Sequence, residues 1–199
     1  MIVFYAAAIP AVFALVAWAL AAQNKGRRKF KDAWRAFAGL HSLTYHDAPG
    51  KHEWPRIEGT YGGVPITMTV KVSGVRVRTF SPLYEAKFAA PLPDGMRFED
   101  PRTMFGHPPW STRTGDAELE KAVIFGAKNP GDAALLAEKR GLRDAVLTFF
   151  RERGKGAGSV SSSGASILGL PLEKDPQIIS ARIESLMKLV LAVEWALKK

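Results

Sequence analysis

His46, Asp47, His52 and Glu53 lie within eight residues of each other, around a Pro-Gly turn, and carry the side chains best suited to metal binding. Imidazole and carboxylate groups are ordinary ligands of transition metals. The spacing of these four residues matches none of the patterns that place ligands around one ion. Histidine and acidic residues are also common in polar turns. The sequence therefore predicts a polar loop here and no metal site.

A second acidic group, Asp116, Glu118 and Glu120, follows Thr114-Gly115 with a period of two. In a strand this spacing would place three carboxylates on one side, where they could bind Mg²⁺ or Ca²⁺ or act as acid and base. No basic or nucleophilic residue accompanies them in the sequence, and charged residues on an edge strand discourage pairing with other chains. We therefore interpret them as the solvent side of a strand. The alternative is a hydrolase or other enzyme whose site uses these carboxylates or the histidines, brought together only by the fold.

Residues 154–159, GKGAGS, contain the one glycine-rich stretch that could be taken for a phosphate-binding loop. A Walker loop requires a glycine four residues before its Gly-Lys pair and Ser or Thr directly after the lysine, whereas this chain has Phe149 and Gly156 there. No serine stands in a Gly-x-Ser-x-Gly elbow, and the chain has no cysteine. The sequence thus predicts no catalytic residue and no cofactor, and it favours a non-enzymatic protein.

The positive charge of the chain is concentrated at one junction. The formal net charge is +9, yet residues 1–23 carry no charged side chain, and the next dozen positions hold six basic residues and one acidic residue. This placement favours binding to anionic lipid headgroups over binding to nucleic acid, which we do not expect. The residues predicted to contact headgroups are Arg27, Arg28, Lys29 and Lys31.

Residues 1–23 are long and apolar enough, as a helix, to cross a hydrocarbon core of roughly 30 Å. The alternative is a cleaved signal peptide ending at Ala19-Leu20-Ala21, but the basic segment that normally precedes such a signal is missing. Lysine and arginine beside a membrane segment favour the cytoplasmic side. We therefore predict a single-pass protein of the cell membrane with its N-terminus outside, a basic juxtamembrane helix over residues 24–41, and a cytoplasmic domain over residues 42–199.

Residues 64–73, VPITMTVKVS, alternate between apolar and polar side chains and predict a strand. Gly62-Gly63 before it and Ser73-Gly74 after it both suit two-residue hairpin loops. Taken literally, they pair Ile57 with Met68 and Val70 with Val77, and they place Lys71 opposite Arg76. The polar face of these strands forms a second basic patch that could bind an anionic partner. Its residues are Arg56, Lys71, Arg76 and Arg78.

The remaining chain alternates between strand and helix patterns. Strands are predicted near residues 83–90, 97, 119–127, 159–162 and 166–172. Helices are predicted over residues 132–140 and 141–153 and from Asp175 to the end, where Asp175 caps the helix and Pro176 begins it. The long apolar stripe of this C-terminal helix predicts docking across the sheet, with a protein partner or a homodimer as the alternative. The fold class is therefore α+β, with an antiparallel meander of about four to seven strands packed by a few helices.

The order of these elements, with Thr114-Gly115-Asp116 ahead of an acidic and apolar segment, resembles a loosely defined group of bacterial proteins of unknown function. That group has an anchored or soluble α+β domain, so the resemblance implies the fold over most of residues 30–199 and no activity. The function we expect from the sequence is a non-enzymatic binding or scaffolding domain held at the cytoplasmic surface of the membrane.

Overall fold

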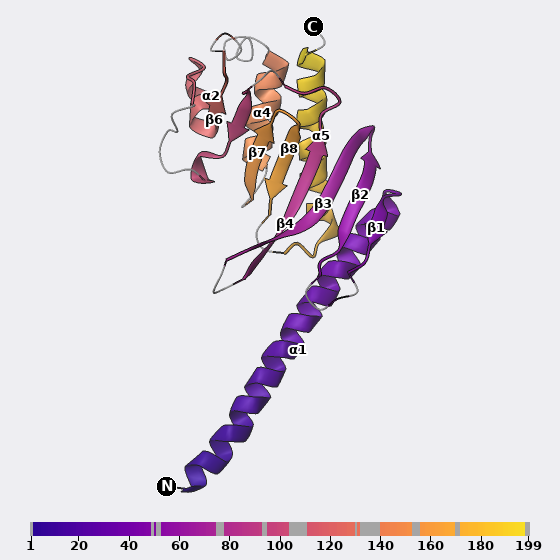
Figure 1. Cartoon of the computed structure of the whole chain (residues 1–199), viewed down its shortest axis with the longest axis vertical. Coiled ribbons are helices and arrows are strands. Elements are labelled where there is room, and N and C mark those ends of the chain that lie inside the picture. The colour runs from indigo at the N-terminus through magenta and orange to yellow at the C-terminus, as the bar shows by residue number, and fades with distance from the viewer. Residues whose placement is uncertain are drawn as a thin grey trace.

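The computed structural model describes residues 2–48, 50, 53–74, 78–92, 95–103, 111–129, 131, 140–152, 156–169 and 172–197. Within the first helix, side chains are described for Leu15, Trp18, Ala21 and Ala22 and from Asn24 onward. The chain forms a small α+β domain from which one long helix projects (Figure 1).

The first helix, α1, runs without interruption from Ile2 to Leu40. Its last third packs into the domain, where Phe30, Trp34 and Phe37 are almost completely buried. Figure 1 shows that the N-terminal part extends away from every other element. The basic segment is therefore the packed end of one continuous helix. Its apolar residues, spaced three and four apart, form the buried side of that end.

Eight strands form one antiparallel sheet in the order β1-β2-β3-β4-β8-β7-β5-β6. The first half is a meander of four strands, and the β7-β8 hairpin then joins the sheet beside β4. The strands are β1 (Thr44–His46), β2 (Arg56–Tyr61), β3 (Val64–Ser73), β4 (Thr79–Lys87), β5 (Arg97–Glu99), β6 (Ile124–Gly126), β7 (Ala157–Ser161) and β8 (Gly164–Leu168). The sheet thus has more strands than the predicted four to seven, and a simple meander does not describe its order.

The predicted register is confirmed on one side of β3 and wrong on the other. Ile57 lies opposite Met68, as the Gly62-Gly63 turn requires, and both glycines have positive φ angles of 55° and 86°. Val70, however, lies opposite Pro82, and Lys71 lies opposite Ser81. β3 ends at Ser73 and β4 begins only at Thr79, so this connection is longer than the two-residue turn that the sequence suggested.

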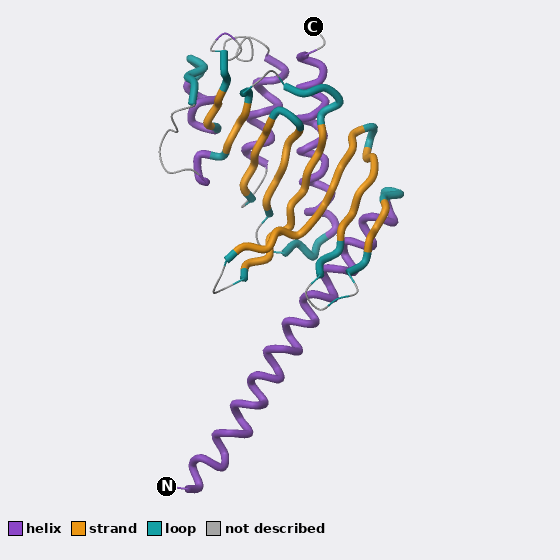
Figure 2. The backbone as a smooth tube through the Cα atoms, in the orientation of Figure 1, coloured by secondary structure: helices purple, strands orange, loops and turns teal. Residues whose placement is uncertain are grey.

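The helices cover one face of the sheet (Figure 2). The C-terminal helix α5 (Pro176–Leu197) packs against β4 and β8, and α4 (Arg140–Glu152) packs beside it. Asp175 caps α5 as predicted, since its carboxylate accepts the Gln177 N–H at 2.9 Å. The apolar stripe of α5 is buried within the chain's own core. Its fully buried members are Ile179, Ile183, Leu186, Leu189, Val190 and Val193.

The predicted strand over residues 119–127 is wrong in its first half. Residues Ala117–Ala122 form the short helix α2, and only Ile124–Gly126 are extended. A 3₁₀ turn, η1 (Pro101–Thr103), follows β5. The predicted helix over 132–140 lies outside the described residues except for its last position.

Across the side chains that the structure describes, we find no helix that is both long and apolar enough to cross a membrane. The predicted span at 1–23 falls mostly on residues whose side chains lie outside that description, so it stays a prediction.

Candidate functional site

The point at which α1 leaves the domain carries a group of exposed cations. Lys25, Arg28 and Lys29 are exposed on α1 just before its packed segment begins at Phe30. A fourth cation comes from the loop before α5, because a Cβ built on Gly26 would lie 3.5 Å from Lys174 Nζ. We call these four residues the exit cluster. All four side chains are positively charged, and they lie where α1 leaves the domain.

Arg27, in contrast, faces the protein. Its guanidinium donates to the carbonyl oxygens of Gly50, at 3.2 Å, and of Glu53. It also lies over the Trp54 ring, 4.9 Å from the ring centroid. Arg27 therefore fastens α1 to the loop between β1 and β2, a role that its position in a basic run does not reveal.

Lys31 has a similar fastening role one turn further along. Its ammonium donates to the Ala48 carbonyl at 2.7 Å and to Asp47 Oδ1 at 3.0 Å. Arg35 reaches the other oxygen of Asp47 at 3.2 Å. The hydrogen bond from Lys31 is the main reason that the pKa of Asp47 lies below its ordinary value. Two of the four predicted headgroup residues thus bind the protein itself, and Arg28 and Lys29 remain exposed.

The second predicted basic patch is divided by the fold. Arg56 pairs with Glu58 at 2.5 Å, which offsets its charge locally. Lys71 and Arg78 are exposed at the far end of the β3-β4 hairpin. Arg76 lies outside the described residues. The patch is therefore reduced to two exposed cations on the hairpin end, near the apolar Val72, which is 46% exposed.

Aromatic rings connect the hairpin end to the exit cluster. Phe80 lies opposite Val72 in the register and packs on Trp54, with 4.8 Å between ring centroids. Trp54 in turn contacts Phe30 of α1, at 5.7 Å between centroids, as well as Arg27. These contacts join the hairpin end to the start of the packed part of α1.

The described members of the histidine cluster each have a hydrogen-bond partner within the protein. His46 Nε2 lies 2.9 Å from Glu58 Oε1 on the sheet. Asp47 accepts a hydrogen bond from Lys31 of α1, and Glu53 accepts the Gly50 N–H. His52 lies outside the description. Within the described residues, no group of three His, Asp or Glu side chains could hold a metal ion.

The acidic trio caps and fastens a helix. Asp116 accepts the backbone N–H groups of Glu118 and Leu119 at 3.0 Å each, which makes it the N-cap of α2. The Arg143 guanidinium beside it lowers the pKa of Asp116 from 3.8 to about 2. Arg143 also donates to Glu118 at 2.8 Å, which joins α4 to α2. The Thr-Gly-Asp motif therefore marks a helix start.

Glu120, the third member of this trio, closes the loop before α2. Its Oε1 accepts the N–H groups of Thr114 at 2.8 Å and Gly115 at 3.0 Å. All three carboxylates thus hold local structure, and none of them reaches a histidine in the described chain. The glycine-rich stretch lies partly outside the description, since Gly154 and Lys155 are not described.

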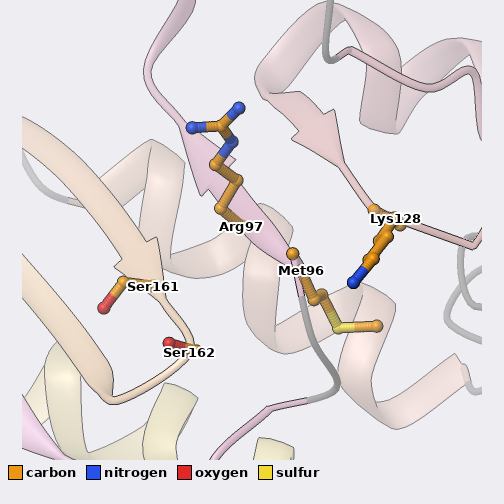
Figure 3. A pocket seen from close by; sticks show the side chains of 7 residues that line it. Met96, Arg97, Lys128, Ser161 and Ser162 are labelled. Atoms are coloured by element: carbon orange, nitrogen blue, oxygen red, sulfur yellow. The ribbon is translucent and has the colours of Figure 1, made fainter.

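A hollow of about 590 Å³ lies at the other end of the sheet (Figure 3). It is formed where β5 begins, β6 ends and β7 turns into β8. Its lining consists of Gly95, Met96, Arg97, Ala127, Lys128, Ser161 and Ser162. Among the described residues, none of the histidines or carboxylates that the sequence singled out lines it. Sequence reasoning could not find this hollow, because its residues come from three separate segments.

The chain was compared with known proteins. No family model and no curated protein matches the sequence. Among solved structures, the chain is similar to the crystal structure of the mycobacterial trehalose monomycolate transport factor A, TtfA. The TM-score is 0.55 at 8% sequence identity, and the match covers 83% of this chain and 95% of that chain. At this identity the likeness shows a shared fold: an α+β domain with an antiparallel sheet and a C-terminal helix.

Proposed function

We propose that the protein is a non-enzymatic binding or scaffolding domain held at the cytoplasmic surface of a membrane by the N-terminal part of α1. The observation that carries this proposal is the form of α1. Its uncharged first part, Ile2 to residue 23, spans roughly 33 Å at 1.5 Å per residue, which matches a hydrocarbon core. Its packed part begins directly after the exit cluster (Figure 1).

The charges near this exit support the proposed orientation. Lys25, Arg28 and Lys29 are exposed at the end of the uncharged segment, where cations favour the cytoplasmic side and attract anionic headgroups. Arg27 and Lys31 support it less directly, because they fix the domain against the same helix. The domain therefore follows the helix without a flexible linker.

The non-enzymatic part of the proposal is supported by the roles of the polar residues. Asp116, Glu118 and Glu120 hold α2, and His46 pairs with Glu58 at a distance from the hollow. The fold neighbour is named as a transport factor, and we propose a role of the same kind, in which the domain binds a partner. A hydrolase is the alternative. Hydrolysis of an ester or phosphoester panel by the full chain, lost in Asp116→Asn or Glu120→Gln, would favour that alternative.

Membrane integration is tested by fractionation of cells that express the full chain. An alkaline carbonate wash strips proteins that only bind the membrane surface, whereas the full chain is expected to stay in the membrane pellet. A control chain without residues 2–23 keeps the exit cluster and is expected in the wash. If the full chain is also removed by the wash, the helix does not hold it in the bilayer.

Orientation is tested with reporters fused after Lys199. A reporter that is active only in the cytoplasm should be active, and one that is active only outside it should be inactive. The reverse pattern would show that the domain lies on the other side, and the proposed role of the exit cluster would fail with it.

A further inference from the structure

The far end of the β3-β4 hairpin projects from the sheet as a ribbon of two strands. β2 pairs with β3 as far as Ile57 opposite Met68, and β8 pairs with β4 as far as Leu168 opposite Leu83. Just beyond these positions the Gly169 N–H still donates to the Pro82 carbonyl at 2.7 Å, and from there the described parts of β3 and β4 pair with each other, through Ser73 opposite Thr79. Figure 1 shows the ribbon reaching back toward the side on which α1 leaves the domain.

Contacts near α1 hold this ribbon in place. Phe80 in the ribbon packs on Trp54, and Trp54 lies between Arg27 and Phe30 of α1. The orientation of the ribbon is thus tied to the direction of the helix. If α1 crosses a bilayer, the ribbon end is carried to the level of the headgroups rather than away from them.

The side chains at the ribbon end suit that environment. Lys71 and Arg78 are exposed cations, and Val72 between them in sequence has 46% of its surface exposed. Cations beside an exposed apolar group are typical of segments that lie in the interface of an anionic bilayer. The exit cluster has the same sign of charge. The two carboxylates that flank Lys174 have partners of their own, since Asp175 caps α5 and Glu173 pairs with Arg182 at 3.5 Å.

We propose, on the basis of the membrane-held topology above, that the ribbon end makes a second contact with the anionic bilayer. Lys71 and Arg78 bind headgroups, and Val72 enters the boundary with the acyl chains. Together with the exit cluster, this contact gives the domain two points on the membrane and fixes its rotation about α1.

The experiment uses single-cysteine labelling, because the native chain has no cysteine. The full chain is reconstituted in vesicles of phosphatidylcholine and phosphatidylglycerol in equal parts, with a polarity-sensitive dye at Ser73→Cys. Shallow spin-labelled lipids are expected to quench this dye and its emission to shift to the blue. A dye at Ser162→Cys, in the exposed β7-β8 turn, should show neither effect. A dye at Ala21→Cys reports whether α1 is inserted.

Charge variants then test the named residues. Lys71→Gln with Arg78→Gln should lower the docking equilibrium constant roughly twenty-fivefold, because each cation near an anionic surface contributes about fivefold. Lys87→Gln with Lys121→Gln removes the same charge from exposed positions elsewhere and should leave docking unchanged. High salt should weaken docking of the native chain.

The outcomes separate this inference from the proposed function. A quenched dye at Ala21→Cys with an unquenched dye at Ser73→Cys would overturn the ribbon contact and leave the anchor standing. Equal losses in the two charge variants would also overturn it, since the named cations would then have no special role. An unquenched dye at Ala21→Cys would refute the anchor and the ribbon contact together.

Discussion

Two double variants of α1 that remove the same charge are expected to have different effects. Arg27→Ala with Lys31→Ala removes the two cations that contact the β1-β2 loop, and Arg28→Ala with Lys29→Ala removes two exposed cations between them. The first pair should destabilise the domain, and the second should leave its stability nearly unchanged. Because the net charge falls by two in both, any general effect of charge is matched.

The expected magnitude follows from the contacts that each variant loses. Arg27 donates to two carbonyl oxygens and lies 4.9 Å from the Trp54 centroid, which we value at about 2 kcal/mol for a half-buried side chain. The hydrogen bond of Lys31 to Ala48 adds about 1 kcal/mol, and its ion pair with exposed Asp47 adds little. The first variant should therefore lose about 3 kcal/mol. Exposed positions such as Arg28 typically change stability by less than about 0.5 kcal/mol.

The assay is thermal unfolding of the full chain in one detergent, followed by circular dichroism and tryptophan fluorescence. For a chain of this size, 3 kcal/mol corresponds to a fall in Tm of roughly 6 to 12 °C for the Arg27 and Lys31 variant. The Arg28 and Lys29 variant should unfold within about 2 °C of the native chain. Equal shifts in both variants, or no shift in the first, would refute the assignment of Arg27 and Lys31 as internal fasteners.

Three further variants test the helix cap, the core and the acidic trio by thermal melts and urea unfolding. Asp175→Ala should cost about 1 kcal/mol by removing the α5 cap, while Asp175→Ser should keep most of it; equal losses would exclude the cap. Ile183→Ala, at a fully buried position, should cost about 2 to 5 kcal/mol independently of protein concentration, whereas Leu191→Ala, 48% exposed, should cost much less. A concentration-dependent loss would instead indicate a dimer seam. Because the pKa of Asp116 is lower in the folded state, its contribution is complete above about pH 4 and is lost toward pH 2. Asp116→Asn keeps a capping side chain but loses the charge facing Arg143, so unfolding should depend less steeply on pH in that window; an unchanged slope would contradict this.

The parts of the fold that depend on local pattern could be predicted from the sequence. The alternation over residues 64–73 and the Gly62-Gly63 turn specified β3 and its pairing with β2, because a two-residue turn leaves only one register. Asp175-Pro176 specified the start of α5 for a similar local reason. In both cases the residues that decide the structure are neighbours in the chain.

The wrong predictions concern places where residues distant in the chain decide the structure. Ser73-Gly74 resembles a hairpin turn, but β4 begins only at Thr79. Val72 therefore lies opposite Phe80, and Phe80 packs on Trp54, which is distant in the chain. The acidic residues at every second position from 116 to 120 suggested a strand. Asp116 instead caps the helix α2, and Arg143 of α4 binds that helix through Glu118. In both cases, contacts with residues distant in the sequence determine the local structure.

The same limit applies to the candidate site. A basic run does not show which of its members face the protein. Arg27 and Lys31 differ from Arg28 and Lys29 because they contact the β1-β2 loop, which only the folded structure reveals. Lys174 joins the exit cluster from the other end of the chain, and no pattern near it indicates this.

The direct passage of α1 into the core determines how the rest of the domain would be presented in the proposed topology. A flexible tether would let the domain take many orientations, whereas here Phe30, Trp34 and Phe37 are core residues of the same helix. Figure 2 shows that the strands run in roughly the same direction as α1, with the helices on one face only. The uncovered face carries a polar row across neighbouring strands, in which Thr67 lies opposite Glu85 and Glu85 opposite Ser166. This face would stand beside the helix axis and away from the bilayer plane, so it would be open to a protein next to the domain on the same membrane.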